Sequence, residues 1–178
     1  MSERRIALLR GINLGATNRV KMPELRALLE ELGYEDVATL VQSGNVVFTS
    51  RAAPSTLEPK LERAIEEQLG VAAKVVVRTR DELAAAIEAN PFPVPEDPKM
   101  LHVTFLAGEP DAGAVKQLEE AEVGDDRIAF EGREIYIDYA NGMGRSELAK
   151  QLGRAKLGVT ATDRNWNTVT KLLEMADQ

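Results

Sequence analysis

The chain has 178 residues, of which 44% are hydrophobic, 29% are charged and none is cysteine. This length suits one compact domain or two small ones. The absence of cysteine excludes disulfides, thiolate metal sites and cysteine nucleophiles, and a single histidine, His102, argues against zinc sites and histidine-based triads. No apolar run approaches the ~20 residues that cross a bilayer. The short apolar run at 6–9 does not resemble a signal peptide, so we expect a cytoplasmic protein without membrane contact.

The net charge is −7, but it is unevenly distributed. Residues 1–26 and 141–171 each carry a net charge of +4, residues 172–178 carry −2, and residues 27–140 carry −13. An acidic body with two basic segments favours a local anion site over a broad nucleic-acid surface. The alternative is that these charges only solvate helix faces.

Hydrophobic periodicity and turn residues predict the elements of the first half. In chain order these are a strand at 6–9, a helix at 23–32, two strands at 37–42 and 45–49, a helix at 55–69, a strand at 74–78 and a helix from 79. Ser55 with Glu58 and Thr79 with Glu82 have the spacing of capping boxes, and Gly70 has the position of a helix terminator. The first six elements have the order of the split βαβ unit of ferredoxin-like folds.

A proline-rich segment at 91–99 follows the first half. Its prolines favour a stiff, extended backbone, which is typical of a connector between domains. We therefore expect a first subdomain at 1–90 and a second at 100–178.

The second half repeats the element order. We expect a strand at 101–106, a helix at 111–121, a hairpin of strands at 127–130 and 135–139, a helix from 146, a short strand at 158–162 and a last helix over 166–175. The predicted fold is therefore α+β, with two tandem ferredoxin-like (βαββαβ) subdomains joined by the proline-rich linker. A single larger sheet that shares strands between the halves is the alternative.

Two segments of the first half combine glycine with polar side chains. In the loop after the first strand, Gly11 permits a positive φ, while Arg10 and Asn13 can grip a carboxylate or phosphate. At the predicted hairpin, Ser43 and Asn45 stand at the end of a sheet, where binding groups are held on rigid elements. The alternative is that both segments are tight turns, whose polar side chains form hydrogen bonds with their own backbone.

Two further segments lie in the second half. The glycines of 142–144 precede a helix whose first amides, with Arg145 and Ser146, can form an anion cradle around Gly144. Arg164, Asn165 and Asn167 cluster at the expected start of the last helix, where they can face a ligand at its positive end. Ser146 and the asparagines can instead be helix caps.

Five motifs carry a resemblance to a known family. They are Leu-Leu-Arg-Gly-Ile-Asn-Leu-Gly at 8–15, Met-Pro-Glu-Leu-Arg at 22–26, Gln-Ser-Gly-Asn-Val-Val-Phe at 42–48, Asn-Pro-Phe at 90–92 and Arg-Asn-Trp-Asn-Thr at 164–168. Together they resemble the bacterial family called domain of unknown function 1697, over essentially the whole chain. The resemblance implies two ferredoxin-like α+β subdomains. It implies no activity, because the family has no established one.

The residues favour a protein that binds a small anionic ligand, a nucleotide or phosphate ester, in a cleft between the subdomains. Arginines would provide bidentate contacts, and any catalysis would act by positioning and charge stabilisation, because no convincing general base stands out. Asp138 and Asp163 are the nearest acidic candidates. We expect no metal and no cofactor.

Two functions of other classes compete with ligand binding. RNA binding on a ferredoxin-like sheet needs aromatic side chains for base stacking, but only 4% of the residues are aromatic and the chain is acidic, so nucleic acid is an unexpected partner. A structural module that forms a homodimer through a sheet face or edge strand also fits the sequence.

Overall fold

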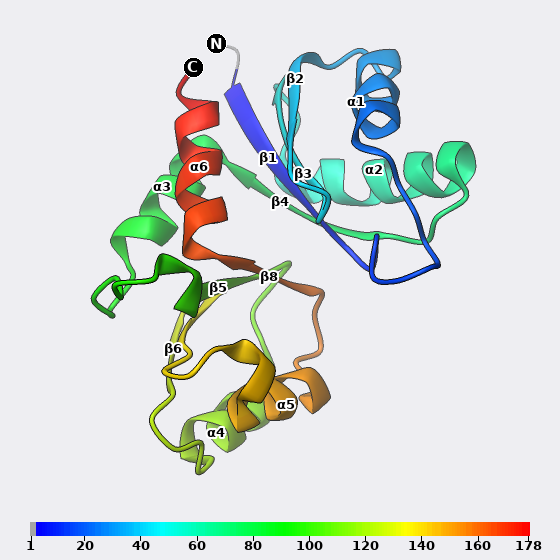
Figure 1. Ribbon diagram of the computed structural model, residues 1–178. Coiled ribbons are helices and arrows are strands. Elements are labelled where there is room, and N and C mark those ends of the chain that lie inside the picture. Colours follow the sequence, from blue (N-terminus) through cyan, green and yellow to red (C-terminus); the bar gives the residue numbers. More distant parts are fainter. Residues whose placement is uncertain (1–2) are drawn as a thin grey trace. The chain divides into compact units, whose positions relative to one another are not determined.

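The computed structural model describes residues 3–178, which form two compact units. The first unit runs to Ala85 and includes Lys171–Gln178, and the second covers Ala86–Thr170. Each unit contains one four-stranded antiparallel sheet, so the chain is α+β (Figure 1).

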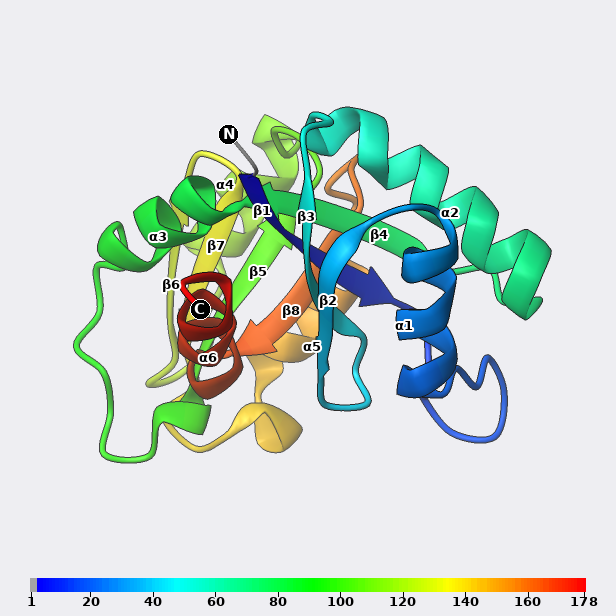
Figure 2. The ribbon, with the colours of Figure 1, turned by 90° about the horizontal axis from the view of Figure 1, so that it is seen from above.

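The first unit contains a sheet with the strand order β2-β3-β1-β4. Its elements are β1 (Glu3–Arg10), α1 (Met22–Glu31), β2 (Glu35–Leu40), β3 (Asn45–Ser50), α2 (Pro54–Leu69) and β4 (Lys74–Thr79). Both α1 and α2 cover one face of this sheet (Figure 2). The core between them holds Ala7 and Leu9 of β1 with Leu25 of α1 and Leu61 of α2. Every residue of the predicted apolar run at 6–9 is buried.

The second unit repeats this arrangement with the strand order β6-β7-β5-β8. Its elements are η1 (Pro98–Met100), β5 (Leu101–Leu106), α4 (Ala112–Glu120), β6 (Arg127–Glu131), β7 (Glu134–Asp138), η2 (Met143–Arg145), α5 (Glu147–Arg154) and β8 (Ala161–Asn165). Leu118 of α4 and Leu148 of α5 pack with Leu106 and Ile137 on one face of the sheet. Ala161 of β8 packs against this core, and the other side chains of β8 are polar.

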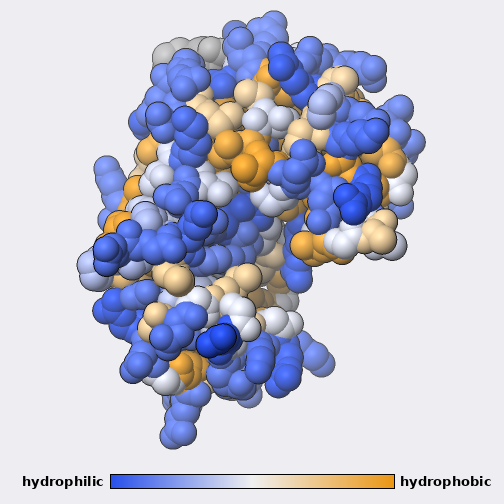
Figure 3. Space-filling view, viewed as in Figure 1, coloured by the Kyte–Doolittle hydropathy of each residue, from blue (hydrophilic) through white to orange (hydrophobic). Residues whose placement is uncertain are grey.

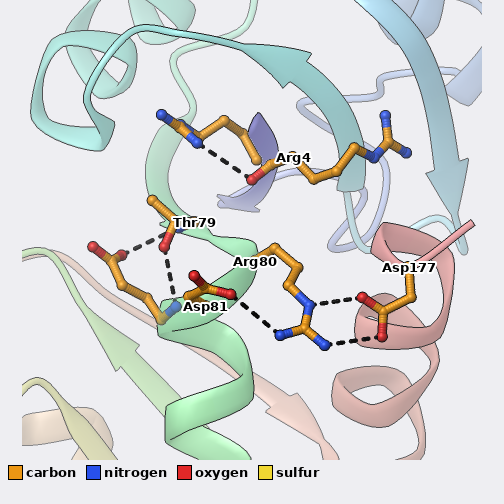
Figure 4. Close-up of polar contacts among 7 residues, drawn as sticks. Arg4, Thr79, Arg80, Asp81 and Asp177 are labelled. Carbon is orange, nitrogen blue, oxygen red and sulfur yellow. Dashed lines mark hydrogen bonds and ion pairs between the residues drawn. The ribbon is translucent and has the colours of Figure 1, made fainter. Parts of the chain in front are cut away.

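Two helices contribute residues to both units: α3 (Arg80–Glu88) and α6 (Trp166–Ala176). Within the first unit, the guanidinium of Arg80 donates from Nε to Asp177 Oδ1 at 2.7 Å and from Nη2 to Asp177 Oδ2 at 3.1 Å (Figure 4). This bidentate pair fastens the C-terminal end of the chain to the start of α3.

One of the two expected capping boxes is present. The amide of Glu82 donates to Thr79 Oγ1 at 3.0 Å, and the amide of Thr79 donates to Glu82 Oε2 at 3.2 Å. The Ser55–Glu58 box is wrong, because α2 begins at Pro54 with Ala53 as its N-cap and no side-chain cap. Glu58 instead accepts a hydrogen bond from the amide of Val77 on β4. Tertiary contact with the sheet thus takes the carboxylate that a local cap would have used.

The end of the chain differs most from expectation. The strand expected at 158–162 lies at 161–165, so Arg164 and Asn165 belong to β8 rather than to the start of a helix. Pairing with β5 decides this register: Thr104 lies opposite Asp163, and His102 lies opposite Asn165. The polar side chains of β8 carry little strand signal of their own. The position of β8 follows instead from its pairing with the buried strand β5.

Candidate functional site

In the first unit, Asn13 closes the loop that follows β1. Its amide Nδ2 donates to the carbonyls of Val20 at 2.9 Å and Gln42 at 2.7 Å, and its Oδ1 accepts from the amide of Val20 at 2.8 Å. Asn13 itself has a φ of 54°, a conformation that asparagine tolerates better than most residues. The side chain thus joins the loop to the turn between β2 and β3.

Gly44 and Asn45 stabilise the same turn, Gly44 by close packing and Asn45 by hydrogen bonds. A Cβ on Gly44 would lie 2.7 Å from Ile12 Cδ1 and 2.8 Å from Leu9 Cβ, so the turn can approach β1 only with glycine at this position. The buried amide of Asn45 donates to the carbonyl of Leu40 and to Ser43 Oγ. These motif residues build the end of the sheet, and Arg10 remains exposed beside it.

In the second unit, the expected anion cradle is a turn pinned by Asp126. One carboxylate oxygen of Asp126 accepts from the amide of Ala140 at 2.8 Å and the other from Ser146 Oγ at 2.6 Å. Ser146 Oγ also accepts from the amide of Ala149, so it is the N-cap of α5. Between these anchors the turn through η2 exposes Gly144 and Arg145 to solvent.

Arg164, Asn165 and Asn167 have three different environments. Arg164 is buried and donates from Nη1 to Thr162 Oγ1 and to the carbonyl of Asp163, and burial lowers the pKa of its guanidinium to about 10. Asn165 Oδ1 accepts from the amide of Thr168 in the first turn of α6. Asn167 is exposed on that turn.

A polar cluster that the sequence did not predict stands on β5 and β8. His102 Nδ1 lies 2.5 Å from Asp163 Oδ2, and Thr104 Oγ1 donates to Asp163 Oδ1 at 2.9 Å. The strand register places His102, Thr104, Asp163 and Asn165 on one face. The Asp163 side chain is 33% exposed and reaches the surface of the unit. The His102 side chain is only 11% exposed, and Thr104 is buried. We call these four residues the His102 cluster.

The His102 cluster and the Arg145 turn lie at the same end of the second sheet. Tyr139, from which the turn begins, presents its ring edge-on to the His102 imidazole with 4.9 Å between centroids. A Cβ on Gly142 would lie 3.7 Å from the sulfur of Met100, two residues before His102. The end of β8, from which α6 starts, pairs with the start of β5 at this same edge (Figure 2). Because β7 and β8 flank β5, their ends stand ~10 Å apart.

The chemistry available at this end is therefore cationic and acid–base. Arg145 offers a guanidinium, Asn167 an amide and His102 an imidazole held by a carboxylate. Within residues 3–178, no group of three or more histidine, aspartate or glutamate side chains is arranged to hold a metal ion. No helix in the same range is both long and apolar enough to cross a bilayer. The visible surface is mostly hydrophilic, with apolar residues in small groups (Figure 3).

Comparison with known proteins identifies the family. The sequence profile of the family described as "Protein of unknown function (DUF1697)" matches residues 2–136, about three quarters of the chain. The chain belongs to the DUF1697 family. No protein of curated function matches it.

A solved structure is similar to this DUF1697 chain over nearly its full length. It is a conserved bacterial protein, SP0830 from Streptococcus pneumoniae, with 26% sequence identity, 99% coverage of both chains and a TM-score of 0.82. The arrangement of elements extends through the C-terminal residues, although the family profile ends at residue 136 and the motif at 164–168 lies beyond it.

The DUF1697 motifs acquire physical roles in the structure. The motif at 8–15 and the motif at 42–48 are parts of one packed unit, because Ile12 contacts the Gly44 position and Asn13 binds the Gln42 carbonyl. At 90–92, Asn90 closes its own turn by accepting from the amide of Phe92 and donating to its carbonyl. The Phe92 ring stacks on the Arg127 guanidinium at 4.8 Å.

Proposed function

We propose that the protein binds a small anionic ligand, a nucleotide or phosphate ester, at the end of the second sheet formed by the Arg145 turn and the His102 cluster. The observation that carries this proposal is the Arg145 turn itself. Two hydrogen bonds to Asp126 and the cap at Ser146 fix its backbone, while the guanidinium of Arg145 remains exposed. Because the turn is already fixed, little backbone conformational entropy is lost when the guanidinium binds a ligand.

The neighbouring groups suit an oxygen-rich ligand. Gly144 has no side chain that could block a ligand from the backbone of the turn. A Cβ placed on Gly144 would have no other atom within 4 Å, so the space beside it is open. Asn167 supplies an exposed amide from the first turn of α6, whose N-terminal end carries partial positive charge. Asp126 and Asp163 are engaged by Ser146 and His102, which reduces their repulsion of an anion.

The residues of the first unit enter this proposal differently. Asn13, Ser43 and Asn45 form hydrogen bonds within and between the two turns at the end of the first sheet, so we propose that they shape the loop beside Arg10. Arg10 and Gly11 are candidates for ligand contact within the first unit. Arg164 is buried, so it would attract the anionic ligand by its positive charge without contacting it. We also propose that each unit is a ferredoxin-like subdomain, since both follow the element order βαββαβ with the second, third, first and fourth strands side by side.

A thermal-shift screen with inorganic phosphate, nucleotides and sugar phosphates tests ligand binding. A ligand at 100 times its Kd adds ~2.7 kcal/mol of apparent stability. Arg145→Ala should remove the shift and leave the unliganded Tm nearly unchanged, because Arg145 is exposed. Arg154→Ala, an exposed arginine at the end of α5, is the matched control and should keep the shift. Equal shifts in the two variants would contradict a site at the Arg145 turn.

A further inference from the structure

The structure gives His102 a defined tautomer. A carboxylate is an acceptor only, so the short contact between Nδ1 and Asp163 Oδ2 requires the proton on Nδ1. Thr104 donates to the other oxygen of the same carboxylate and holds its plane in place. With Nδ1 occupied by a proton, the lone pair of the neutral imidazole lies on Nε2. Among residues 3–178, Nε2 forms no hydrogen bond.

Among residues 3–178, Asp163 is the one charged side chain that forms an ion pair with His102. Tyr139 contacts the ring edge-on, and burial, with the charges of Asp163 and Asp126, raises the pKa of its hydroxyl above the usual range. Tyr139 therefore stays neutral and does not compete for a proton at neutral pH. Ile137 lies opposite His102 on β7 and Asn165 lies opposite it on β8, and neither titrates.

We propose that His102 is the acid–base group of the anion site, with Nε2 directed to the ligand and Asp163 as its positioning residue. This inference rests on the proposed function, because it places the ligand beside the Arg145 turn. It goes beyond ligand binding by assigning a proton-transfer activity. An imidazole held by an aspartate and an exposed arginine at the same end of the sheet suit a phosphate ester, because the arginine can bind its charge and the imidazole can transfer a proton.

The proton step balances without another reagent. When a water molecule beside the phosphorus loses a proton, its O–H bond breaks and an Nε2–H bond forms on His102. The electron pair left on the water oxygen forms the new P–O bond. The ester P–O bond then breaks, and the leaving oxygen takes the proton back from Nε2. Asp163 stabilises the transient imidazolium without receiving its proton.

Nuclear magnetic resonance can test the tautomer directly, because the chain has one histidine and therefore one set of imidazole signals. Long-range ¹H–¹⁵N correlations of the full-length protein, recorded at a pH where the ring is neutral, should show the proton on Nδ1. In Asp163→Ala the proton should move mainly to Nε2, the preferred tautomer of an unpartnered imidazole. Far-ultraviolet circular dichroism would confirm that the variant is folded. If the wild-type ring carries its neutral proton on Nε2, the proposal is overturned.

Inorganic phosphate is the probe that tests whether a ligand bound at the Arg145 turn reaches His102. It should shift the His102 ring signals of the wild-type protein, and Arg145→Ala should weaken this effect at least tenfold in apparent Kd. Arg154→Ala should leave it unchanged. Stabilisation by phosphate without any change in the His102 signals would leave ligand binding intact and overturn the role of His102. If phosphate neither stabilises the protein nor shifts these signals, both proposals fail.

Diethyl pyrocarbonate tests access to Nε2 independently. The folded protein should react at His102, with one carbethoxy group per chain detected by mass spectrometry on that peptide. Phosphate should slow the reaction in the wild type but not in Arg145→Ala. An imidazole that reacts only after unfolding is a structural group, and that result would contradict the proposal.

Discussion

Individual side chains in this protein separate into those that build turns and those that remain available to a ligand. Asn13 and Asn45 use their amides to close the two turns at one end of the first sheet. Arg10 at the end of β1 and Arg145 in the turn through η2 are exposed to solvent. Asparagine thus cross-links turns at Asn13 and Asn45, whereas Asn167 is exposed. Their hydrogen-bond partners distinguish the two roles.

Gly44 shows how strictly one position can be constrained. Gly44→Ala should destabilise the protein by ~2–4 kcal/mol, from a positive φ of 88° and from the close contacts of the new Cβ with Ile12 and Leu9. Gly15→Ala is the matched control, because Gly15 has a φ of 97° and open space around the Cβ direction. It should lose only the ~1–2 kcal/mol due to φ. Urea unfolding of both variants measures the difference, and equal losses would show that the contacts at Gly44 relax freely.

At the scale of elements, hydrogen bonds from side chains to the backbone decide where helices begin. The N-terminal ends of α4 and α5 are capped by Asp111 and Ser146, and the sequence suggested the cap at Ser146. The end of α2 has no side-chain cap, and its expected partner Glu58 binds the backbone of β4. A local pattern therefore succeeds only where no tertiary partner competes for the same side chain.

The two predicted capping boxes provide a direct comparison. Thr79→Ala removes an acceptor for the Glu82 amide and should cost ~1 kcal/mol of unfolding free energy. Ser55→Ala lies in the first turn of α2, where Ser55 caps nothing, and should change stability by less than ~0.5 kcal/mol. Chemical denaturation of the two variants provides the measurement. A loss at Ser55 as large as that at Thr79 would argue against the cap assignment.

The pair between Arg80 and Asp177 predicts a dependence on pH. Hydrogen bonds from Arg80, supported by its charge, hold the pKa of Asp177 below its usual range. A carboxyl with a lowered folded-state pKa contributes stability above its unfolded pKa and loses it as the pH falls through the folded value. The Tm difference between the wild type and Asp177→Asn should therefore be largest near neutral pH and disappear in acid.

The control for this prediction lies on α6, three residues before Asp177. Glu174→Gln removes the looser contact with Lys171 at 3.6 Å. Its Tm difference from the wild type should be smaller at neutral pH, because an exposed single contact stabilises little. Both differences should shrink at high salt. A difference for Asp177→Asn that persists unchanged at pH 2 would show that the ion pair is not its source.

The whole molecule combines a repeated architecture with a divided charge. Both units have the same element order and strand order, although their sequences share no obvious identity. Residues 1–26 and 141–171 each carry a net charge of +4, and the remainder of the chain has a net negative charge. In each unit the basic segment includes a glycine-bearing turn at the end of a sheet.

This charge distribution predicts weak interaction with nucleic acids. Fluorescence anisotropy with single-stranded RNA and duplex DNA at about 50 mM salt should show no binding in the micromolar range, because few phosphates could be neutralised by an acidic chain. Few aromatic side chains are present to stack on bases. A wild-type titration that saturates at micromolar protein and weakens at about 200 mM salt would reverse this ranking and favour a nucleic-acid function.

Most of the element order could be predicted from the sequence, because it is encoded by local signals. The apolar run at 6–9, the stripe of leucines in α1 and the αL glycine after α2 each act over a few neighbouring residues. The position of β8 could not be predicted, because polar residues form a strand there through pairing with buried β5. The site followed the same rule. The Arg145 turn was visible as glycines before a helix, whereas the His102 cluster joins residues 61 positions apart.

The sequence by itself determined the α+β class, the two tandem halves and the family, since composition, periodicity and motifs are properties of neighbouring residues. Only the tertiary structure decided which polar side chains meet. His102 and Asp163 can form a hydrogen bond only when β5 and β8 pair in the observed register. A one-residue slip would place the two side chains on opposite faces of the sheet. Hydrogen bonds act over about 3 Å, and strand pairing alone brings such distant residues within that reach.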